Sequence, residues 1–189
     1  MNNSNKIILD LCGGTGSSSA PYVKAGYDVR VITLPDQDVR LFRYTDNPVY
    51  GILAAMDCTH FAGSGAQYWA AKDQDGRTLE ALSILDACCR IILTHKPKFW
   101  AIENPIGRTK DFIGPVKFYF DPCDYGDAYT KRTCLWGDFN IPRWKPIRPE
   151  RACPQGSWLQ QLGGRSEKTK RLRSVTPPAF SKAFFEANR

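Results

Sequence analysis

The chain has 189 residues and a mass of 21.3 kDa, a size that favours one domain over two. Hydrophobic residues make up 42% and charged residues 24% of the chain, which is a globular composition and excludes extensive disorder and fibrous classes. The formal net charge is +7, and no apolar run approaches the roughly 18 residues that a membrane span needs.

The first predicted unit is a strand, a glycine turn, a helix and a second strand. Residues 6–12 form an apolar run typical of a buried parallel strand, and glycines follow at 13–16. Residues 20–25 favour a short helix that ends at Gly26, where glycine suits a C-terminal cap. Residues 27–34 are rich in β-branched side chains, so the whole unit predicts a βαβ arrangement.

The same alternation continues through the next hundred residues. Residues 49–55 and 99–102 predict strands, and 78–93 has the apolar spacing of a helix between them. Residues 116–120 and 133–136 predict two shorter strands. This pattern predicts an α/β fold with a mostly parallel sheet and helices on both of its faces.

Residues 141–173 carry nine basic residues against two acidic ones, so this segment holds the whole net charge. Four prolines and three glycines interrupt any helical or strand period, so we expect a long surface loop. Phosphate backbones attract such a segment, and its tryptophans, Trp144 and Trp158, could stack on bases. The alternative is a basic loop that only contacts solvent.

The seven cysteines include no CxxC pair, and the chain has only two histidines. This inventory disfavours a structural zinc site, so we expect no metal. The N-terminal residues lead straight into an apolar segment and do not resemble a signal peptide. We therefore expect an intracellular protein, not associated with a membrane, whose thiols are mostly buried and free.

Residues 10–16, Asp-Leu-Cys-Gly-Gly-Thr-Gly, form a turn at the carboxyl end of the first strand, where open α/β sheets bind ligands. The turn is not a phosphate loop, because no lysine follows it. It is not a complete dinucleotide fingerprint either, because Ser19 occupies the third glycine position. The turn alone is compatible with a ligand site or with a tight turn that binds nothing.

Several motifs occur in the same order as in the DNA cytosine-5 methyltransferases, and each resembles a motif of that family. Residues 10–16 resemble its S-adenosylmethionine loop, and residues 174–185 resemble the closing motif that packs against this loop. Residues 51–63 resemble the strand and loop that carry the nucleophilic cysteine, and 96–104 resemble the strand that ends in Glu-Asn. Residues 125–137 are similar to the later motif whose arginine faces the target base.

The resemblance implies a Rossmann-like, S-adenosylmethionine-dependent methyltransferase that acts on carbon 5 of cytosine in DNA. It implies that Cys58, Glu103 and Arg132 are catalytic, with Lys131 as a competitor for the role of Arg132. The residues implied to bind the cofactor are Asp10, Leu11, Cys12, Gly13, Gly14, Thr15, Gly16, Thr33, Asp38 and Thr176. From the charge of the basic segment we expect DNA contacts from Arg143, Lys145, Arg165, Lys168, Lys170 and Arg171.

These residue types suit the implied chemistry. A cysteine thiolate is the strongest nucleophile among side chains near neutral pH and can add to carbon 6 of cytosine. An acid such as Glu103 is then needed at ring nitrogen 3, which gains electron density. Cys58 follows a predicted strand and enters a Gly/Ser-rich loop, unlike Cys88 and Cys89 within the predicted helix. The alternative for Cys58 is a buried structural thiol.

The chain departs from the family pattern at two places. Asp57 stands where the family has a proline, and a carboxylate there would raise the pKa of Cys58. The second strand ends in Thr33-Leu34-Pro35, without the acidic residue that usually holds the cofactor ribose.

The chain is short for this family and resembles its compact bacteriophage forms, which implies a bacterial cytoplasm. We expect a catalytic core at 1–137, a reduced target-recognition segment at 138–173, and a C-terminal helix at 174–189 that returns to the cofactor site. Two alternatives stay open. One is a nucleic-acid-binding relative that has lost catalysis, and the other is a cytosine methyltransferase that acts on a free nucleotide or RNA.

Overall fold

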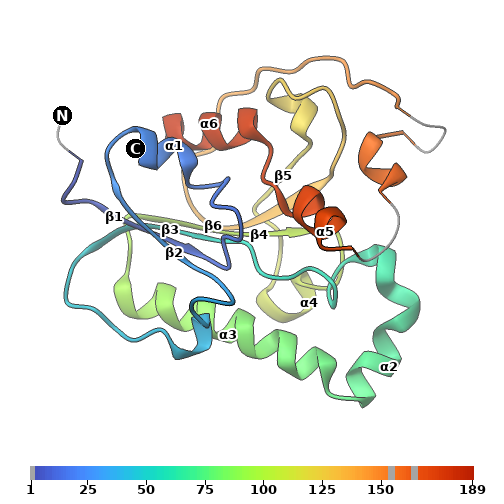
Figure 1. The fold of residues 1–189 in the computed structure, drawn as a ribbon, viewed down its shortest axis with the longest axis horizontal. Coiled ribbons are helices and arrows are strands. Elements are labelled where there is room, and N and C mark those ends of the chain that lie inside the picture. The colour runs from blue at the N-terminus through green and yellow to red at the C-terminus, as the bar shows by residue number, and fades with distance from the viewer. Residues whose placement is uncertain (1–2, 153–155, 163–165) are drawn as a thin grey trace.

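The computed structural model describes residues 3–152, 156–162 and 166–189. Its centre is a six-stranded sheet with the order β2-β1-β3-β4-β6-β5 (Figure 1). The strands are β1 (Ile7–Leu11), β2 (Asp28–Ile32), β3 (Val49–Ala54), β4 (Phe99–Pro105), β5 (Phe118–Phe120) and β6 (Thr133–Asp138). Strands β1 to β4 run parallel, and β6 runs antiparallel to both of its neighbours. The predicted α/β fold with a mostly parallel sheet is confirmed.

Helices cover both faces of this sheet. The α-helices are α1 (Ala20–Lys24), α2 (Trp69–Gln74), α3 (Arg77–His95), α4 (Lys110–Ile113), α5 (Glu167–Ser174) and α6 (Pro178–Ala187). The 3-10 turns are η1 (Val39–Leu41), η2 (Gly63–Tyr68), η3 (Pro122–Asp124) and η4 (Trp158–Gln161). Helices α1 and α6 lie together over one face, and α3 lies across the other (Figure 1). In the described ranges, none of these helices is long and apolar enough for a membrane span.

Alternation along the strands divides the core into two layers. Ile7, Leu9 and Leu11 of β1 join the cluster beneath α3, whereas Ile8 joins the cluster beneath α1 and α6. The α3 layer is mainly aliphatic, and the opposite layer is rich in aromatic rings, including Tyr22, Phe99, Phe120, Phe180 and Phe184. All five residues of β1 are buried, as its continuous apolar run predicts for a central strand.

The C-terminal half of the basic segment differs from the loop that we expected over residues 141–173. Residues 158–161 form the 3-10 turn η4, and residues 167–174 form the helix α5. Ser166 begins α5, because its side chain accepts a hydrogen bond from the Thr169 amide. The helix has almost no apolar face, and therefore its period is invisible to a hydrophobicity pattern.

Candidate active site

The predicted site residues belong to three adjacent strands of the sheet or to the loops that follow them. The glycine turn follows β1, the loop with Cys58 follows β3, and Glu103 lies within β4, where it pairs with Leu135 of β6. Strands β1, β3 and β4 are parallel neighbours, so their carboxyl ends meet at one edge. This edge is where open α/β sheets bind their ligands.

The glycine turn is built around the buried carboxylate of Asp10. This side chain is fully buried and accepts hydrogen bonds from Ser19 Oγ at 2.6 Å and from Ser18 Oγ at 3.1 Å. Burial raises the pKa of Asp10 to about 6, although both hydroxyls act in the opposite direction. A Cβ atom on Gly13 would lie 2.4 Å from Asp10 Cγ, so only glycine fits there.

The outer side of the turn presents backbone groups at the surface. Gly14 and Thr15 are exposed, and the Gly14 amide donates to Thr33 Oγ1 at 3.3 Å. The Thr176 amide donates to Ser17 Oγ at 2.9 Å, so the C-terminal segment contacts the residue that directly follows the turn. Leu11, by contrast, is fully buried in the core and can offer only its backbone to a ligand.

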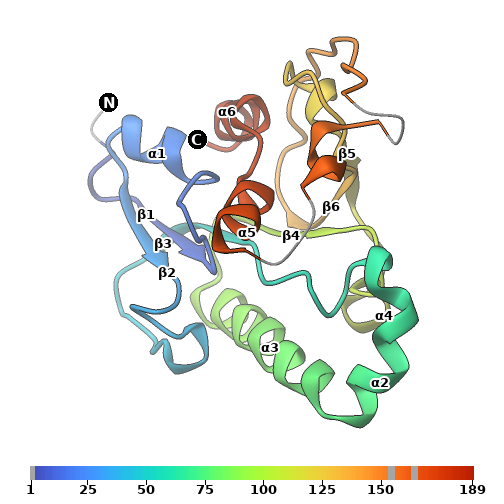
Figure 2. The same ribbon diagram turned by 45° about the vertical axis from the view of Figure 1, so that its right-hand side comes forward.

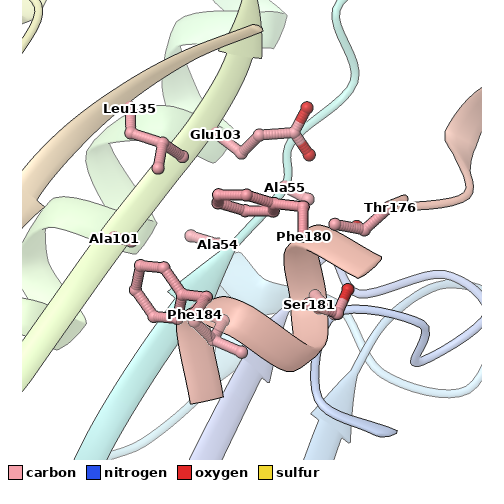
Figure 3. Close-up of a pocket in the computed structure, with 11 residues that line it drawn as sticks. Ala54, Ala55, Ala101, Glu103, Leu135, Thr176, Phe180, Ser181 and Phe184 are labelled. Atoms are coloured by element: carbon pink, nitrogen blue, oxygen red, sulfur yellow. The ribbon is translucent and has the colours of Figure 1, made fainter. Parts of the chain in front are cut away.

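A small cavity lies beside Glu103 and is also lined by Ser18 and Thr176. Its volume is about 30 Å³, and Figure 3 shows Phe180 and Phe184 of α6 against Ala54 and Ala101 of the sheet. Glu103 lies at one end of this apolar lining, and its carboxylate points away from the phenyl rings (Figure 3). The cavity therefore brings Glu103 close to Ser18 and Thr176, which lie next to the glycine turn.

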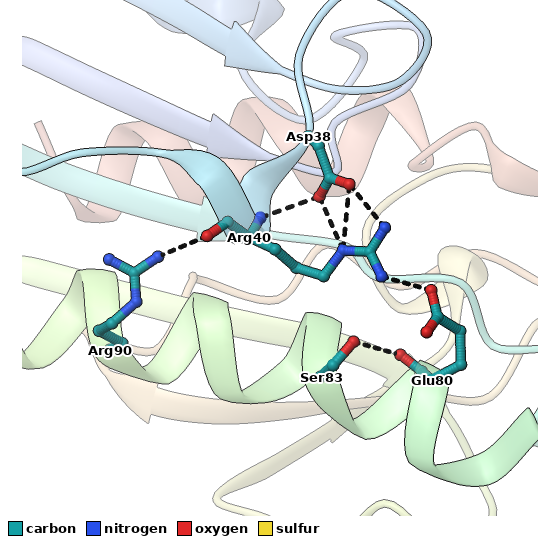
Figure 4. A network of polar contacts seen from close by, with 5 residues as sticks. All are labelled: Asp38, Arg40, Glu80, Ser83 and Arg90. Atoms are coloured by element: carbon teal, nitrogen blue, oxygen red, sulfur yellow. Dashed lines mark hydrogen bonds and ion pairs between the residues drawn. The ribbon is translucent and has the colours of Figure 1, made fainter. Parts of the chain in front are cut away.

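Asp38 is held by an arginine from its own segment. Its carboxylate accepts from the Arg40 amide at 2.9 Å and from Arg40 Nη2 at 2.6 Å (Figure 4). These bonds lower the pKa of Asp38. Arg40 also pairs with Glu80 of α3, while Arg90 of α3 donates to the Arg40 carbonyl at 3.2 Å. A cofactor bound at Asp38, as the resemblance implies, would share this carboxylate with Arg40.

Cys58 begins a tight turn, in which later backbone amides donate hydrogen bonds to its carbonyl. The Cys58 carbonyl accepts from the amides of Phe61 at 3.0 Å and Ala62 at 2.9 Å. The residue as a whole is exposed, yet protein atoms packed around its sulfur reduce the hydration of the thiolate. This desolvation raises the pKa of Cys58, and the carboxylates of Asp57 and Glu103 add to the rise.

Lys131 is the basic residue whose charge lowers the pKa of Cys58 against these effects. Arg132, the residue predicted to face the base, is half exposed and donates to Asp121 at 3.2 Å. Its guanidinium also lies 5.5 Å from the ring centre of Tyr119. The catalytic role of Arg132 stays a prediction, and its competitor Lys131 is the residue whose charge favours the Cys58 thiolate.

Asp57 directs its carboxylate back into its own loop. It accepts from the Thr59 amide at 2.9 Å and from Thr59 Oγ1 at 2.6 Å. Within the described ranges it forms no ion pair with Arg132. A second cavity, of about 170 Å³, lies where this loop faces α3, and is lined by Met56, Asp57, His60, Glu80, Ala81 and Ile84.

The loop that follows β3 (residues 55–63, the Cys58 loop) is contacted by two buried cations that were not expected from the sequence. Lys72 and Arg108 are each 6% exposed, and each donates to a backbone carbonyl of this loop. Their partners lie 13 and 48 positions away in the chain, so no local pattern could indicate them. The only available signal was the position of Arg108 shortly after the Glu-Asn motif.

The basic segment packs partly against the site. Trp158 packs on Tyr129 with ring centres 5.6 Å apart. Burial raises the pKa of Tyr129 to about 12, and the charges of Asp127 and Glu103 make smaller contributions to this rise. Trp144 packs on Phe118 and stays 53% exposed. Of the predicted DNA contacts, four are exposed, namely Arg143, Lys145, Lys168 and Arg171. Arg165 and the Lys170 side chain lie outside the described residues.

Across the part of the chain that the structure describes, no group of three or more His, Cys, Asp or Glu residues is arranged to hold a metal ion.

No protein-family model matches the chain, and no curated protein matches it either. Among solved structures it is similar to the crystal structure of a presumed DNA modification methyltransferase encoded within an Escherichia coli prophage. The two share 17% sequence identity at a TM-score of 0.50, over 77% of this chain and 52% of that chain. The chain thus spans about half the length of the protein it matches. At this identity the likeness establishes the fold that the two chains share.

Proposed function

We propose that this protein transfers a methyl group from S-adenosylmethionine to carbon 5 of cytosine in DNA, through a covalent bond between Cys58 and the base. The observation that carries the proposal is that the glycine turn, the loop with Cys58 and Glu103 belong to three neighbouring parallel strands, β1, β3 and β4. The charges of Glu103 and Lys131 both act on Cys58. A nucleophile, an acid and a cation within electrostatic reach are the groups that this chemistry requires. The similar fold of a presumed DNA modification methyltransferase agrees with it.

The glycine turn fits a nucleoside cofactor. Gly14 and Thr15 leave backbone groups open at the carboxyl edge, and Gly13 brings the backbone close to the buried Asp10. The residues proposed to hold the cofactor are those of the turn with Thr33, Asp38 and Thr176. When bound, S-adenosylmethionine supplies an electrophilic methyl group on a sulfonium.

The side chains of the chain itself account for the remaining chemistry. The Cys58 thiolate forms a bond to carbon 6, and the displaced electron pair reaches ring nitrogen 3, where Glu103 donates a proton. The methyl group that a bound cofactor would supply passes to carbon 5 as its bond to the sulfonium breaks, and the electron pair of that bond stays on sulfur as a neutral thioether. Loss of the carbon 5 proton to a base expels the thiolate and restores the aromatic ring, and nitrogen 3 returns its proton to Glu103. Lys131 promotes the first step, because its charge favours the thiolate.

DNA would reach the site along the basic segment. Exposed Arg143, Lys145, Lys168 and Arg171 can contact phosphates, and a cytosine flipped out of the duplex can reach Cys58. The contact between Trp158 and Tyr129 supports a target-recognition role for residues 138–173, between a core at 1–137 and the helix at 174–189.

One assay separates this proposal from the alternatives. The protein is incubated with tritiated S-adenosylmethionine and duplex DNA, single-stranded DNA, RNA or dCMP, and the modified nucleoside is identified. We expect 5-methylcytosine in duplex DNA. Transfer only to RNA or dCMP would support the alternative substrates. Salt-dependent DNA binding without any transfer would support a relative that has lost catalysis, which the raised pKa of Cys58 beside Asp57 also favours.

The nucleophile is tested by a pair of cysteine variants. Cys58→Ser should abolish transfer, because a hydroxyl does not ionise near neutral pH, and DNA containing 5-fluorocytosine should form a covalent complex through Cys58. Cys89→Ser on α3 is the matched control and should retain transfer. Retention of wild-type activity by Cys58→Ser would refute the covalent mechanism.

A further inference from the structure

Arg108 occupies the centre of a buried polar network behind the Cys58 loop. Its Nε donates to the His60 carbonyl at 3.0 Å, and its Nη1 donates to Asp73 at 2.8 Å. Its Nη2 donates to Thr78 Oγ1 at 2.7 Å, and the guanidinium lies 4.9 Å from the ring centre of Trp69. One planar group thus joins the Cys58 loop to α2 and α3.

The backbone around Arg108 pairs with the same loop. The Arg108 amide donates to the Phe61 carbonyl at 2.9 Å, and the Gly63 amide donates to the Ile106 carbonyl at 2.8 Å. A Cβ atom on Gly107 would lie 1.9 Å from the Phe61 oxygen, so this approach requires glycine. The segment that continues β4 is therefore joined to the Cys58 loop by both backbone and side chain.

Lys72 holds the adjacent peptide of the loop. Its ammonium donates to the Thr59 carbonyl at 2.6 Å. Two consecutive carbonyls after Cys58, those of Thr59 and His60, therefore accept from buried cations on different elements. Hydrogen bonds from charged donors are stronger than neutral ones, so they hold this turn against rotation of its peptides.

We propose that Arg108 is a positioning residue that sets the Cys58 loop relative to Glu103, an inference that rests on Cys58 and Glu103 acting together as proposed above. Glu103 lies in β4, and Arg108 lies in the continuation of the same segment. Each contact from Arg108 to the loop therefore ties the nucleophile to the strand that carries the acid. A reaction between two groups and one base depends steeply on such an arrangement.

The guanidinium geometry is essential to this role. Its three nitrogens reach a carbonyl, a carboxylate and a hydroxyl in three directions at once. A lysine at this position would keep the charge, but its single ammonium nitrogen could not reach the three acceptors in the same geometry. The loop would then move more freely, and water would reach the Cys58 sulfur more easily.

The test compares Arg108→Lys with Arg77→Gln. Arg77 lies at the nearby start of α3 and pairs with the exposed Asp75, not with the loop. In Arg108→Lys we expect kcat to fall by about tenfold or more, with KM for S-adenosylmethionine unchanged within about twofold. Alkylation of Cys58 by iodoacetamide at neutral pH, followed by peptide mass spectrometry, should become faster, because the thiol is better hydrated. Arg77→Gln should match the wild type in all three measurements.

Opposite movements of kcat and alkylation are the signature of positioning, because general loss of structure would raise KM as well. Unchanged kcat and alkylation in Arg108→Lys would overturn the proposal. If that variant does not fold, Thr78→Val removes one acceptor of Arg108 and should show the same changes on a smaller scale. If the wild type transfers no methyl group, the proposed function fails, and the alkylation rates still decide whether Arg108 controls the loop.

Discussion

Asp10 and Asp57 are two carboxylates of the site whose surroundings are opposite. Asp10 is fully buried beneath the glycine turn and bonded to two serine hydroxyls. Asp57 is exposed and bonded to the amide and hydroxyl of Thr59. Burial controls the titration of Asp10, whereas the charge of Asp57 acts on the neighbouring Cys58. The two carboxylates therefore lead to different predictions, one for the pH dependence of folding and one for the pH dependence of Cys58 reactivity.

Asp10 should make folding depend on pH between about 4 and 7. Burial raises the pKa of Asp10 from 3.8 to about 6, so the folded protein keeps a proton that the unfolded chain releases. The stability gained from the protonated form is complete below pH 3.8 and is lost as pH rises through about 6. Asp10→Asn lacks this dependence. The free energy of unfolding of the variant, relative to that of the wild type, should therefore rise by about 2 kcal/mol between pH 4 and pH 7. Urea unfolding at each pH measures the gain, and a constant difference would contradict the prediction.

Asp57 should restrain the reactivity of Cys58. The Asp57 charge contributes to the raised pKa of Cys58, and Asp57→Asn removes that charge while keeping an oxygen for Thr59. We expect the midpoint of the pH dependence of Cys58 alkylation to move to lower pH. Asp46→Asn, at an exposed position that does not act on Cys58, is the control and should leave the midpoint in place. A midpoint that rises, or does not move, in Asp57→Asn would show that Asp57 does not oppose the thiolate.

At the scale of elements, β4 organises the site because it lies between the parallel and antiparallel parts of the sheet. It pairs with β3 on one side and β6 on the other, and its continuation holds the Cys58 loop. The close approach of β6 requires glycine at position 137, where φ is +150° and a Cβ atom would lie 2.1 Å from the Trp100 oxygen. The position of Glu103 therefore depends on this pairing.

Gly137→Ala should destabilise the fold by more than about 2 kcal/mol, because it combines a strained backbone with a clash against β4. Gly65→Ala is the matched control, since its nearest neighbour would be 3.8 Å away and its φ is not positive. Urea unfolding should show a change within about 0.5 kcal/mol for that variant. Equal stability of the two variants would mean that β4 and β6 separate at little cost.

At the scale of the whole molecule, positive charge and the candidate site occur together. The basic helix α5 runs into Val175 and Thr176, and Thr176 contacts the glycine turn. Figure 2 shows α5 below α6, with the remainder of the basic segment next to β5. Nucleic acid bound to this helix would therefore lie next to the carboxyl edge of the sheet.

Changing Lys168, Arg171 and Arg173 of α5 to glutamine should weaken DNA binding and flatten its salt dependence. Each lost phosphate contact lowers the log–log slope by about 0.9, so the slope should fall by up to about 2.7. The control changes Lys24, Lys96 and Lys98, which are exposed and precede β2 and β4 at the amino ends of the strands. Fluorescence anisotropy over a salt series measures both slopes. If the two triple variants share one slope, α5 does not face the DNA.

Local sequence patterns were sufficient to predict the strands β1 and β2 and the helix α3. The apolar run of β1, the branched residues of β2 and the long period of α3 each lie within one element, so the sequence predicts them within a few residues. The short helices α2 and α4 and the charged helix α5 lack an apolar period long enough to detect, because packing and caps define them.

By itself, the sequence determined the α/β fold, the βαβ start and the association of the glycine turn, Cys58 and Glu103 with successive strands, because each of these depends on neighbours along the chain. Only the tertiary structure decided that Arg40 pairs with Asp38, that the charge of Lys131 reaches Cys58, and that Arg108 bonds to the Cys58 loop. These outcomes depend on side-chain directions and on partners that are distant in sequence, such as Ser17 and Thr176, which are 159 positions apart. A periodic pattern carries no information about such pairs, because packing in three dimensions selects them.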